Sequence, residues 1–254
     1  MYLLKLIYLN TTFYVLLVLF TASYLPLSTL YLALLSLVVS RRQLVRHLRR
    51  CISWYGWTVV RIFPFPLVRI RYVPSGEKNL RPGRLYVCNH RSLSDAWLMG
   101  LLSVELIQIA KDYVLRLPVF GVVARLAGYL SPTDLSFEEL SRKIRGLLED
   151  GVSIITFPEG TRSGSTQIGQ FHSVLFRIAL DTRCPIVPIC ITGNERIPAR
   201  GSLLLRPGRI RVCELPALRW EQYRRLSAYQ LKNNVRHILA ERSRTFEKPL
   251  AQAS

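Results

Sequence analysis

The sequence predicts an α/β fold, in which a mainly parallel sheet is flanked by helices and an apolar N-terminal helical segment associates with a membrane. Two observations predict this architecture. Short apolar runs alternate with amphipathic stretches between residues 68 and 216, the pattern of a parallel sheet covered by helices. Residues 1–40 are apolar, with Lys5 as their one charged side chain, and five arginines follow within the next ten residues. We therefore divide the chain into residues 1–40, 41–67, 68–216 and 217–254.

Pro26 divides the apolar tract of residues 1–40 into two halves, about residues 3–22 and 30–39. A helix that spans a bilayer needs about 20 apolar residues. The tract is therefore either a helical hairpin embedded in one leaflet or a single kinked helix that crosses the membrane. We prefer the hairpin because the second half is too short to cross alone. A buried helical pair in a soluble protein remains an alternative, whereas the length of the tract argues against a secretory signal peptide.

Residues 41–67 form a basic and aromatic linker. Arginines directly after an apolar tract are typical of the cytoplasmic flank of a membrane segment, and they attract anionic lipids. The runs WYGW at 54–57 and FPFP at 63–66 either form an interfacial belt or contact the folded core. The net charge is +19, but a nucleic-acid binder has no need of the apolar tract. We expect anionic membrane lipids and no nucleic acid as partners, and a domain that faces the cytosol from the inner, cytoplasmic membrane.

Residues 68–216 carry the predicted sheet. Its strand candidates are residues 68–73, 85–88, 105–110, 152–157, 186–191 and 210–215. The helix candidates are residues 95–102, 117–127, 137–149 and 171–182, and Ser136 with Glu139 forms a capping box before the third of these. Ligands bind such sheets outside the carboxyl ends of the strands. Side chains that follow the strands are therefore the first candidates for function.

The run NHRSLSD follows the strand candidate at 85–88 and places His90 and Asp95 five residues apart. Asp95 begins a stretch with helical spacing, where the exposed amides of a helix start favour a carboxylate. From there it can hold the imidazole of His90 in one tautomer, and a histidine held in this way can remove a proton from a hydroxyl group. The same spacing also occurs where a capped helix lies beside a structural histidine, so the pair alone does not decide.

The run FPEGTRSG follows the strand candidate at 152–157 and is suited to a polar, anionic head group. Arg162 offers a planar fork of donors to a phosphate, Glu159 can accept a hydrogen bond from a substrate hydroxyl, and Gly160 lets the backbone approach closely. An ordinary turn, in which Glu159 and Arg162 pair with neighbouring charges, is the structural alternative.

In this order and at about 70 residues' separation, the two runs resemble the glycerolipid acyltransferases typified by 1-acylglycerol-3-phosphate (lysophosphatidic acid) O-acyltransferase. The resemblance covers about residues 68–212. It implies the α/β sandwich of that family and transfer of a fatty acyl group from acyl-CoA or acyl carrier protein to a lysophospholipid, giving phosphatidic acid. It makes His90 the general base and Asp95 its orienting partner. The substrate-binding residues that it implies are Glu159, Gly160, Thr161, Arg162, Lys111 and Pro188, with Arg162 on the phosphate.

Two departures from the family pattern put the acceptor lipid in doubt. Asp134 stands where the family's second box ends in an arginine that is credited with binding glycerol phosphate, and His172 stands where a lysine is usual. An acid at 134 would repel a phosphate. A different lyso-lipid, including an amino-acid-containing one such as a lyso-ornithine lipid, is therefore an alternative acceptor. A catalytically silent lipid-binding or scaffold protein is the alternative from another class, and the intact His90–Asp95 pair argues against it.

The C-terminal part, residues 217–254, is a predicted basic helix that either lies on the membrane, docks an acidic acyl carrier protein, or presents a solvated face. The chain has five cysteines, an odd number without metal-ligand spacing, which indicates buried thiols in a reduced compartment. It contains no Gly-x-Ser-x-Gly elbow, so a covalent acyl-enzyme is not indicated. We expect no metal and no bound cofactor, with the acyl thioester acting as co-substrate.

Overall fold

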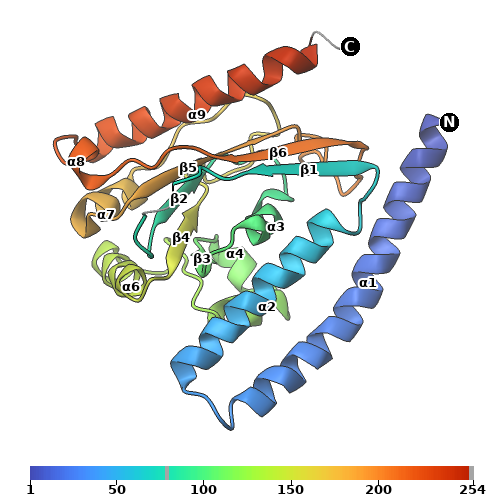
Figure 1. Cartoon of the computed structure of the whole chain (residues 1–254), viewed down its shortest axis with the longest axis horizontal. Helices are drawn as coiled ribbons and strands as arrows, with labels where there is room; N and C mark the ends of the chain where they lie inside the picture. Colours follow the sequence, from blue (N-terminus) through green and yellow to red (C-terminus); the bar gives the residue numbers. More distant parts are fainter. Residues whose placement is uncertain (78–79, 252–254) are drawn as a thin grey trace.

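A six-stranded sheet forms the centre of the computed structural model, which describes residues 1–77 and 80–251 (Figure 1). The sheet order is β1-β6-β5-β2-β4-β3, and every neighbouring pair is parallel except β5 and β6. The predicted mainly parallel α/β sheet is confirmed, and each predicted strand end lies within two residues of the observed one. The strands are β1 (Val68–Val73), β2 (Leu85–Cys88), β3 (Leu106–Gln108), β4 (Ser153–Thr156), β5 (Ile186–Thr192) and β6 (Gly208–Glu214).

The two faces of the sheet bury separate sets of side chains because successive residues of a strand point to opposite sides. In β2, Leu85 and Val87 belong to one apolar cluster, and Tyr86 and Cys88 belong to the other. The first cluster is completed by α6 (Phe137–Glu149), α7 (Val174–Thr182) and α9 (Ala228–Ala251). The second is completed by α1 (Tyr2–Leu35), α2 (Arg41–Arg61), α3 (Asp95–Leu98) and the 3₁₀ turn η1 (Met99–Leu101). The sheet is therefore covered on both faces, as its long apolar strands require.

Local signals in the sequence explain several helix ends. The predicted capping box is confirmed, since Ser136 Oγ accepts from the Glu139 amide at 3.2 Å and the Glu139 side chain accepts from the Ser136 amide at 3.2 Å. The helix predicted at 117–127 begins later, as α5 (Phe120–Leu126), because Pro118 and the positive φ of Val119 interrupt it. Two further short helices are α4 (Asp112–Leu115) and α8 (Trp220–Tyr223).

The preferred interpretation of the N-terminal tract, a hairpin that turns at Pro26, is wrong. Pro26 lies inside α1, which continues as one helix to Leu35, and the turn occurs at residues 36–40, after which α2 runs back beside α1 (Figure 1). A proline removes one backbone N–H donor from a helix. In apolar surroundings the remaining backbone groups can form hydrogen bonds only within the helix, which favours a helix that continues past the proline. Of the 34 residues of α1, Leu9 and Phe13 are buried. Among the described residues, α1 is the one helix long and apolar enough to cross a membrane, judged by length and composition alone.

The segment predicted as a basic linker is largely the helix α2, and part of its charge binds the folded domain. Arg46 Nε lies 2.9 Å and Arg49 Nη1 2.7 Å from the carboxylate of Glu105, and Arg49 Nε donates to the Ala127 carbonyl at 2.8 Å. Arg49 is buried. These two arginines therefore attach α2 to the sheet domain through Glu105.

The aromatic residues of this segment fall into a buried and an exposed group. Tyr55 and Phe63 are buried in the core, whereas Trp54 is 67% and Phe65 is 65% exposed. Gly100 lets the turn η1 lie close to α2, because a Cβ at this position would lie 2.6 Å from the Ser53 carbonyl oxygen on α2. The segment thus combines a core contact with exposed aromatic side chains.

The basic C-terminal helix α9 packs on the sheet through Leu231, Val235 and Leu239, all fully buried. Two of its cations bind the loop before α7. Lys232 donates to the carbonyl of residue 171 at 3.1 Å, and Arg236 donates to the carbonyls of residues 168 and 169 at 2.9 and 2.7 Å. Part of the positive charge that looked free in the sequence therefore holds the fold together.

Candidate active site

The two sequence motifs meet because their strands are neighbours. In the sheet, β2 pairs with β4, with Val87 opposite Thr156, so the loops that follow these strands leave the same edge side by side. The His90 amide donates to Glu159 Oε1 at 2.7 Å, and the Ser163 amide donates to the His90 carbonyl at 2.8 Å. Residues about 70 apart in the sequence thus form one site at the carboxyl edge of the sheet.

His90 and Asp95 lie in direct contact at this edge. The distance from His90 Nδ1 to Asp95 Oδ2 is 2.8 Å, and Asp95 is fully buried at the start of α3. The same carboxylate oxygen accepts from the Arg91 amide at 2.6 Å and the Ser92 amide at 2.9 Å. The His90 side chain is 21% exposed, and no residue in the described ranges binds its Nε2 atom. A fixed carboxylate on one ring nitrogen and an open second nitrogen is the arrangement of a general base.

Asn194, which the sequence motifs did not indicate, completes this pair. Its Nδ2 donates to Asp95 Oδ1, the oxygen that His90 does not use, and Asn194 is fully buried. It follows β5, which pairs with β2 on the side opposite to β4. In the sequence it lies two residues after the end of an apolar strand, which marks it as a residue of a strand-end loop but does not reveal its partner.

Glu159 joins two loops. The carboxylate is 8% exposed, and each oxygen accepts a backbone amide, Oε1 from His90 and Oε2 from Gly169 at 2.8 Å. Burial raises the pKa of the Glu159 carboxyl, and the two amide donors offset part of that rise. A Cβ on Gly169 would lie 2.9 Å from Oε2, so glycine is needed for this contact. In the sequence Glu159 suggests a partner for a substrate hydroxyl, whereas the geometry gives it the role of fixing the His90 backbone.

The rest of the FPEGTRSG loop lies open beside this contact. Gly160 has a φ of +67°, and a Cβ there would lie 3.1 Å from His172 Nε2, so the loop turns tightly against His172. Thr161 is exposed and Arg162 is partly exposed. Within residues 1–77 and 80–251, no carboxylate lies in ion-pair range of Arg162. Its guanidinium is thus available to an anionic ligand.

The two weaker candidates lie farther from His90 in the fold. Lys111 is exposed at the start of α4, after β3, and β4 separates that strand from β2. Pro188 is buried in the middle of β5, opposite Val87 of β2, inside the sheet. The structure therefore brings His90, Asp95 and the loop of residues 159–162 together, and it does not bring Lys111 or Pro188 into that group.

Asp134, the departure from the family pattern, lies beside a second acid. A hydrogen bond with Asp112, together with desolvation and the negative charge of Asp112, raises the pKa of the exposed Asp134 carboxyl. Asp112 also forms an ion pair with Arg116 at 2.6 Å. The position where an arginine was expected is therefore part of a small group of charges, at or near the surface, that contains two carboxylates.

Two cavities border the site. An apolar cavity of about 170 Å³ lies between α1, α2 and the NHRSLSD loop, with Phe13, Val59 and Trp97 among its lining residues. A polar cavity of about 540 Å³ is lined by Thr166 and Arg206, among others. The first suits a hydrocarbon chain and the second a charged group. Among the described residues, no group of three or more His, Cys, Asp and Glu side chains is placed to hold a metal ion.

Comparison with known proteins agrees with this architecture. The model of the family described as Acyltransferase matches residues 71–192. A 1-acyl-sn-glycerol-3-phosphate acyltransferase from Cocos nucifera is 36% identical over 133 residues, which is 50% of this chain but only 43% of that protein. One from Limnanthes alba is 27% identical over 68% of this chain and 70% of its own length.

The crystal structure of the 1-acyl-sn-glycerophosphate (LPA) acyltransferase PlsC from Thermotoga maritima has the same fold. It matches with a TM-score of 0.72 and 21% sequence identity over 96% of both chains. The family-model match and the sequence relatives lead to the same conclusion: residues 71–192 form an Acyltransferase domain similar to that of the 1-acyl-sn-glycerol-3-phosphate acyltransferases.

Proposed function

We propose that this protein transfers a fatty acyl group from an acyl thioester to the free hydroxyl of 1-acylglycerol-3-phosphate, giving phosphatidic acid. The observation that carries the proposal is the contact of His90 with the buried Asp95, which leaves Nε2 of His90 open at the carboxyl edge of the sheet. The names of the relatives support the same acceptor.

In the proposed reaction, His90 Nε2 removes the proton from the acceptor hydroxyl as its oxygen attacks the thioester carbonyl. Asp95 stabilises the imidazolium that forms. The tetrahedral intermediate then collapses, the carbon–sulfur bond breaks, and the imidazolium returns its proton to the leaving thiolate. An ester and a free thiol result. Glu159 takes part indirectly, because its carboxylate holds the His90 amide.

The same site offers places for the parts of the acceptor. Arg162 would bind the phosphate through its planar fork of donors. The apolar cavity beside Trp97 would take a hydrocarbon chain. The donor would be acyl-CoA or acyl carrier protein, which are both acidic and would be attracted by a net charge of +19. The proposed reaction uses the donor as a co-substrate and requires no metal or bound cofactor.

We further propose that α1 lies in one leaflet of the cytoplasmic membrane, with the site facing the cytosol. Contacts along its length hold α1 to the rest of the chain: Asn10 Nδ2 donates to the Leu205 carbonyl at 2.9 Å, and the Tyr24 hydroxyl donates to the Cys51 carbonyl at 2.9 Å. The opposite side of α1 exposes leucine, valine and tyrosine side chains. A helix attached in this way presents one apolar face to lipid.

The test measures thiol release by purified protein in lipid vesicles, with acyl-CoA or acyl carrier protein as donor and a panel of lyso-lipids as acceptors. We expect release that depends on 1-acylglycerol-3-phosphate and disappears in His90→Ala. Release from no combination, or release that His90→Ala leaves unchanged, would overturn the proposal and favour a lipid-binding role without catalysis.

A second acceptor class is favoured by one observation. Asp134 stands where the family pattern has an arginine, with Asp112 beside it, and carboxylates suit a cationic head group better than a phosphate. The acceptor panel therefore includes an amino-acid-containing lyso-lipid. Faster transfer to that acceptor than to 1-acylglycerol-3-phosphate would replace the first acceptor and leave the chemistry at His90 unchanged.

A further inference from the structure

Arg91, the residue directly after the proposed base, is the largest fully buried side chain among the described residues, at 1% exposure. A buried guanidinium is stable only when carboxylates and other acceptors surround it. None of its side-chain partners takes part in the chemistry proposed above, so that chemistry does not use the guanidinium.

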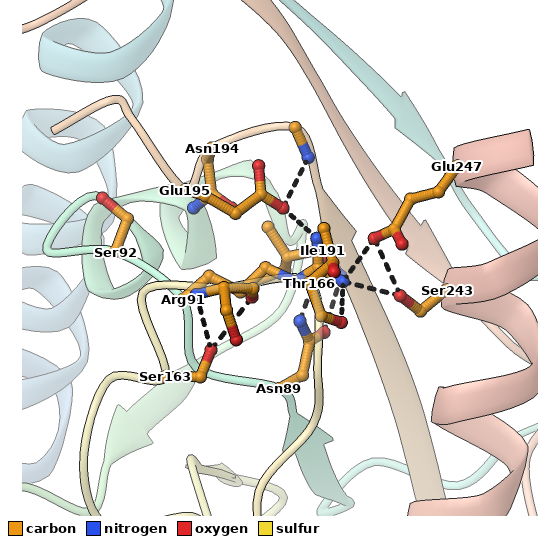
Figure 2. Close-up of polar contacts among 12 residues, drawn as sticks. Asn89, Arg91, Ser92, Ser163, Thr166, Ile191, Asn194, Glu195, Ser243 and Glu247 are labelled. Carbon is orange, nitrogen blue, oxygen red and sulfur yellow. Dashed lines mark hydrogen bonds and ion pairs between the residues drawn. The ribbon is translucent and has the colours of Figure 1, made fainter. Parts of the chain in front are cut away.

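The guanidinium of Arg91 joins three segments that are far apart in the sequence (Figure 2). Its Nη2 donates to the Thr166 carbonyl at 3.0 Å, in the loop after the FPEGTRSG motif, and to Ser243 Oγ at 2.6 Å and Glu247 Oε1 at 2.7 Å on α9. Its Nη1 donates to Glu195, in the loop after β5. Burial alone would lower the pKa of Arg91, but Glu195 and Glu247 raise it, so the group stays charged.

Both ends of Arg91 are connected to the buried carboxylate of the site. Its backbone amide donates to Asp95 Oδ2 at 2.6 Å. Its side chain holds Glu195, whose neighbour in the chain, Asn194, donates to Asp95 Oδ1. The two oxygens of Asp95 are thus each held by a group whose position depends on Arg91.

We propose that Arg91 is a positioning residue for the acyl transfer, through which α9 and the loop after β5 hold Asp95, and so His90, in the reactive geometry. The proposal rests on the proposed function. It makes α9 a structural part of the active site, although that helix lies outside the matched residues 71–192.

Arginine is suited to this position for a geometric reason. Its planar guanidinium reaches Glu195 through one nitrogen and Thr166, Ser243 and Glu247 through another. A lysine keeps the charge but concentrates it in a single ammonium group, so it can replace part of the network at most. A methionine has a similar shape without the charge and leaves both carboxylates without a cationic partner.

The experiment compares Arg91→Met, Arg91→Lys, Glu247→Gln and Ser243→Ala in the full chain with a matched control on the same helix. The control is the exposed pair Arg244 and Glu241, at 2.8 Å, changed to Arg244→Met and Glu241→Gln. For each variant, kcat and KM for both substrates are measured well below the unfolding midpoint, which is determined separately.

We expect Arg91→Met to lower kcat by roughly tenfold to hundredfold, with KM little changed, because the network orients the base and does not bind substrate. Arg91→Lys should recover part of that loss. Glu247→Gln should lower kcat in the parent protein. It should lower kcat by a smaller factor in the Arg91→Met variant, because the two residues act together. The control variants should stay within about twofold of the parent.

A kcat that is unchanged in folded Arg91→Met, or a loss that appears in KM and not in kcat, would overturn the proposal. If Arg91→Met does not fold, Glu247→Gln and Ser243→Ala test the proposal. In that case, kcat values equal to those of the control variants would overturn it. Failure of the proposed function is distinguishable, because the parent protein itself would then release no thiol.

Discussion

The Nδ2 amide of Asn194 donates a hydrogen bond to Oδ1 of Asp95, while His90 contacts the other oxygen of the same carboxylate. Both Asn194 and Asp95 are fully buried. Asp95 therefore cannot turn about its side-chain axis without losing a bond on one side or the other. The proposed base is thus held by Asp95 and, through Asp95, by Asn194, which lies 99 positions from Asp95 in the sequence.

Replacing Asn194 should reduce catalysis more than substrate binding. A hydrogen bond to a charged group contributes about 1.5–3 kcal/mol, so Asn194→Ala should lower kcat by roughly tenfold to hundredfold, with small changes in KM. Steady-state kinetics with both substrates checks this. Asn233→Ala, on α9, is the control and should behave like the parent protein. Equal kcat in the two variants would show that Asn194 does not support Asp95.

The His90–Asp95 contact could be predicted from the sequence because the two residues are five apart and both follow the end of the same strand. Asn194 could not, since its position depends on β5 lying next to β2, and the order of the strands is not visible in local patterns. The burial of Arg91 could not be predicted either. An arginine between polar residues is expected to be exposed, and its partners Glu195 and Glu247 are far away in the sequence. Strand positions were predictable because unbroken apolar runs are short and clearly bounded.

The N-terminal helices α1 and α2 show where local signals mislead. Pro26 favoured a break, yet α1 passes through it. The arginines of α2 suggested a lipid contact, yet Arg49 is buried against Glu105. Neither the continuous course of α1 past Pro26 nor the contact of Arg49 with Glu105 can be read from local sequence.

Arg162 should determine affinity for the acceptor phosphate. Lysine keeps the charge but loses the planar pair of donors, so Arg162→Lys should raise KM for 1-acylglycerol-3-phosphate by about tenfold, with kcat less affected. The control is Arg200→Lys, an exposed arginine whose Cβ lies close to Gly164 of the same loop. Kinetics with acceptor as the varied substrate checks it. A normal KM in Arg162→Lys would remove Arg162 from the phosphate site.

Glu105 should be important for attaching α2 to the sheet domain. Glu105→Gln leaves the buried Arg49 without its carboxylate, and breaking such a pair costs about 3 kcal/mol. The matched control is Asp150→Asn, which removes the exposed partner of Arg42 and should cost less than about 1 kcal/mol. Chemical denaturation in detergent micelles measures both changes. Equal losses in the two variants would mean that the buried position of Arg49 contributes nothing.

The cysteines should be unreactive in the folded protein, which would agree with a mechanism that has no acyl-cysteine intermediate. Burial raises the pKa of the Cys88 and Cys184 thiols and raises that of Cys190 to about 12. The thiolate is the reactive form, so these groups stay protonated at neutral pH, and their alkylation should remain slow as the pH rises past the ordinary thiol range near 8.5. We expect N-ethylmaleimide to leave activity intact in the folded protein and to modify all five cysteines after unfolding. The rates are measured by mass spectrometry from neutral to alkaline pH, with glutathione as the reference thiol. Rapid modification of Cys88 together with loss of activity would contradict the prediction and would place a nucleophilic thiol two residues before His90.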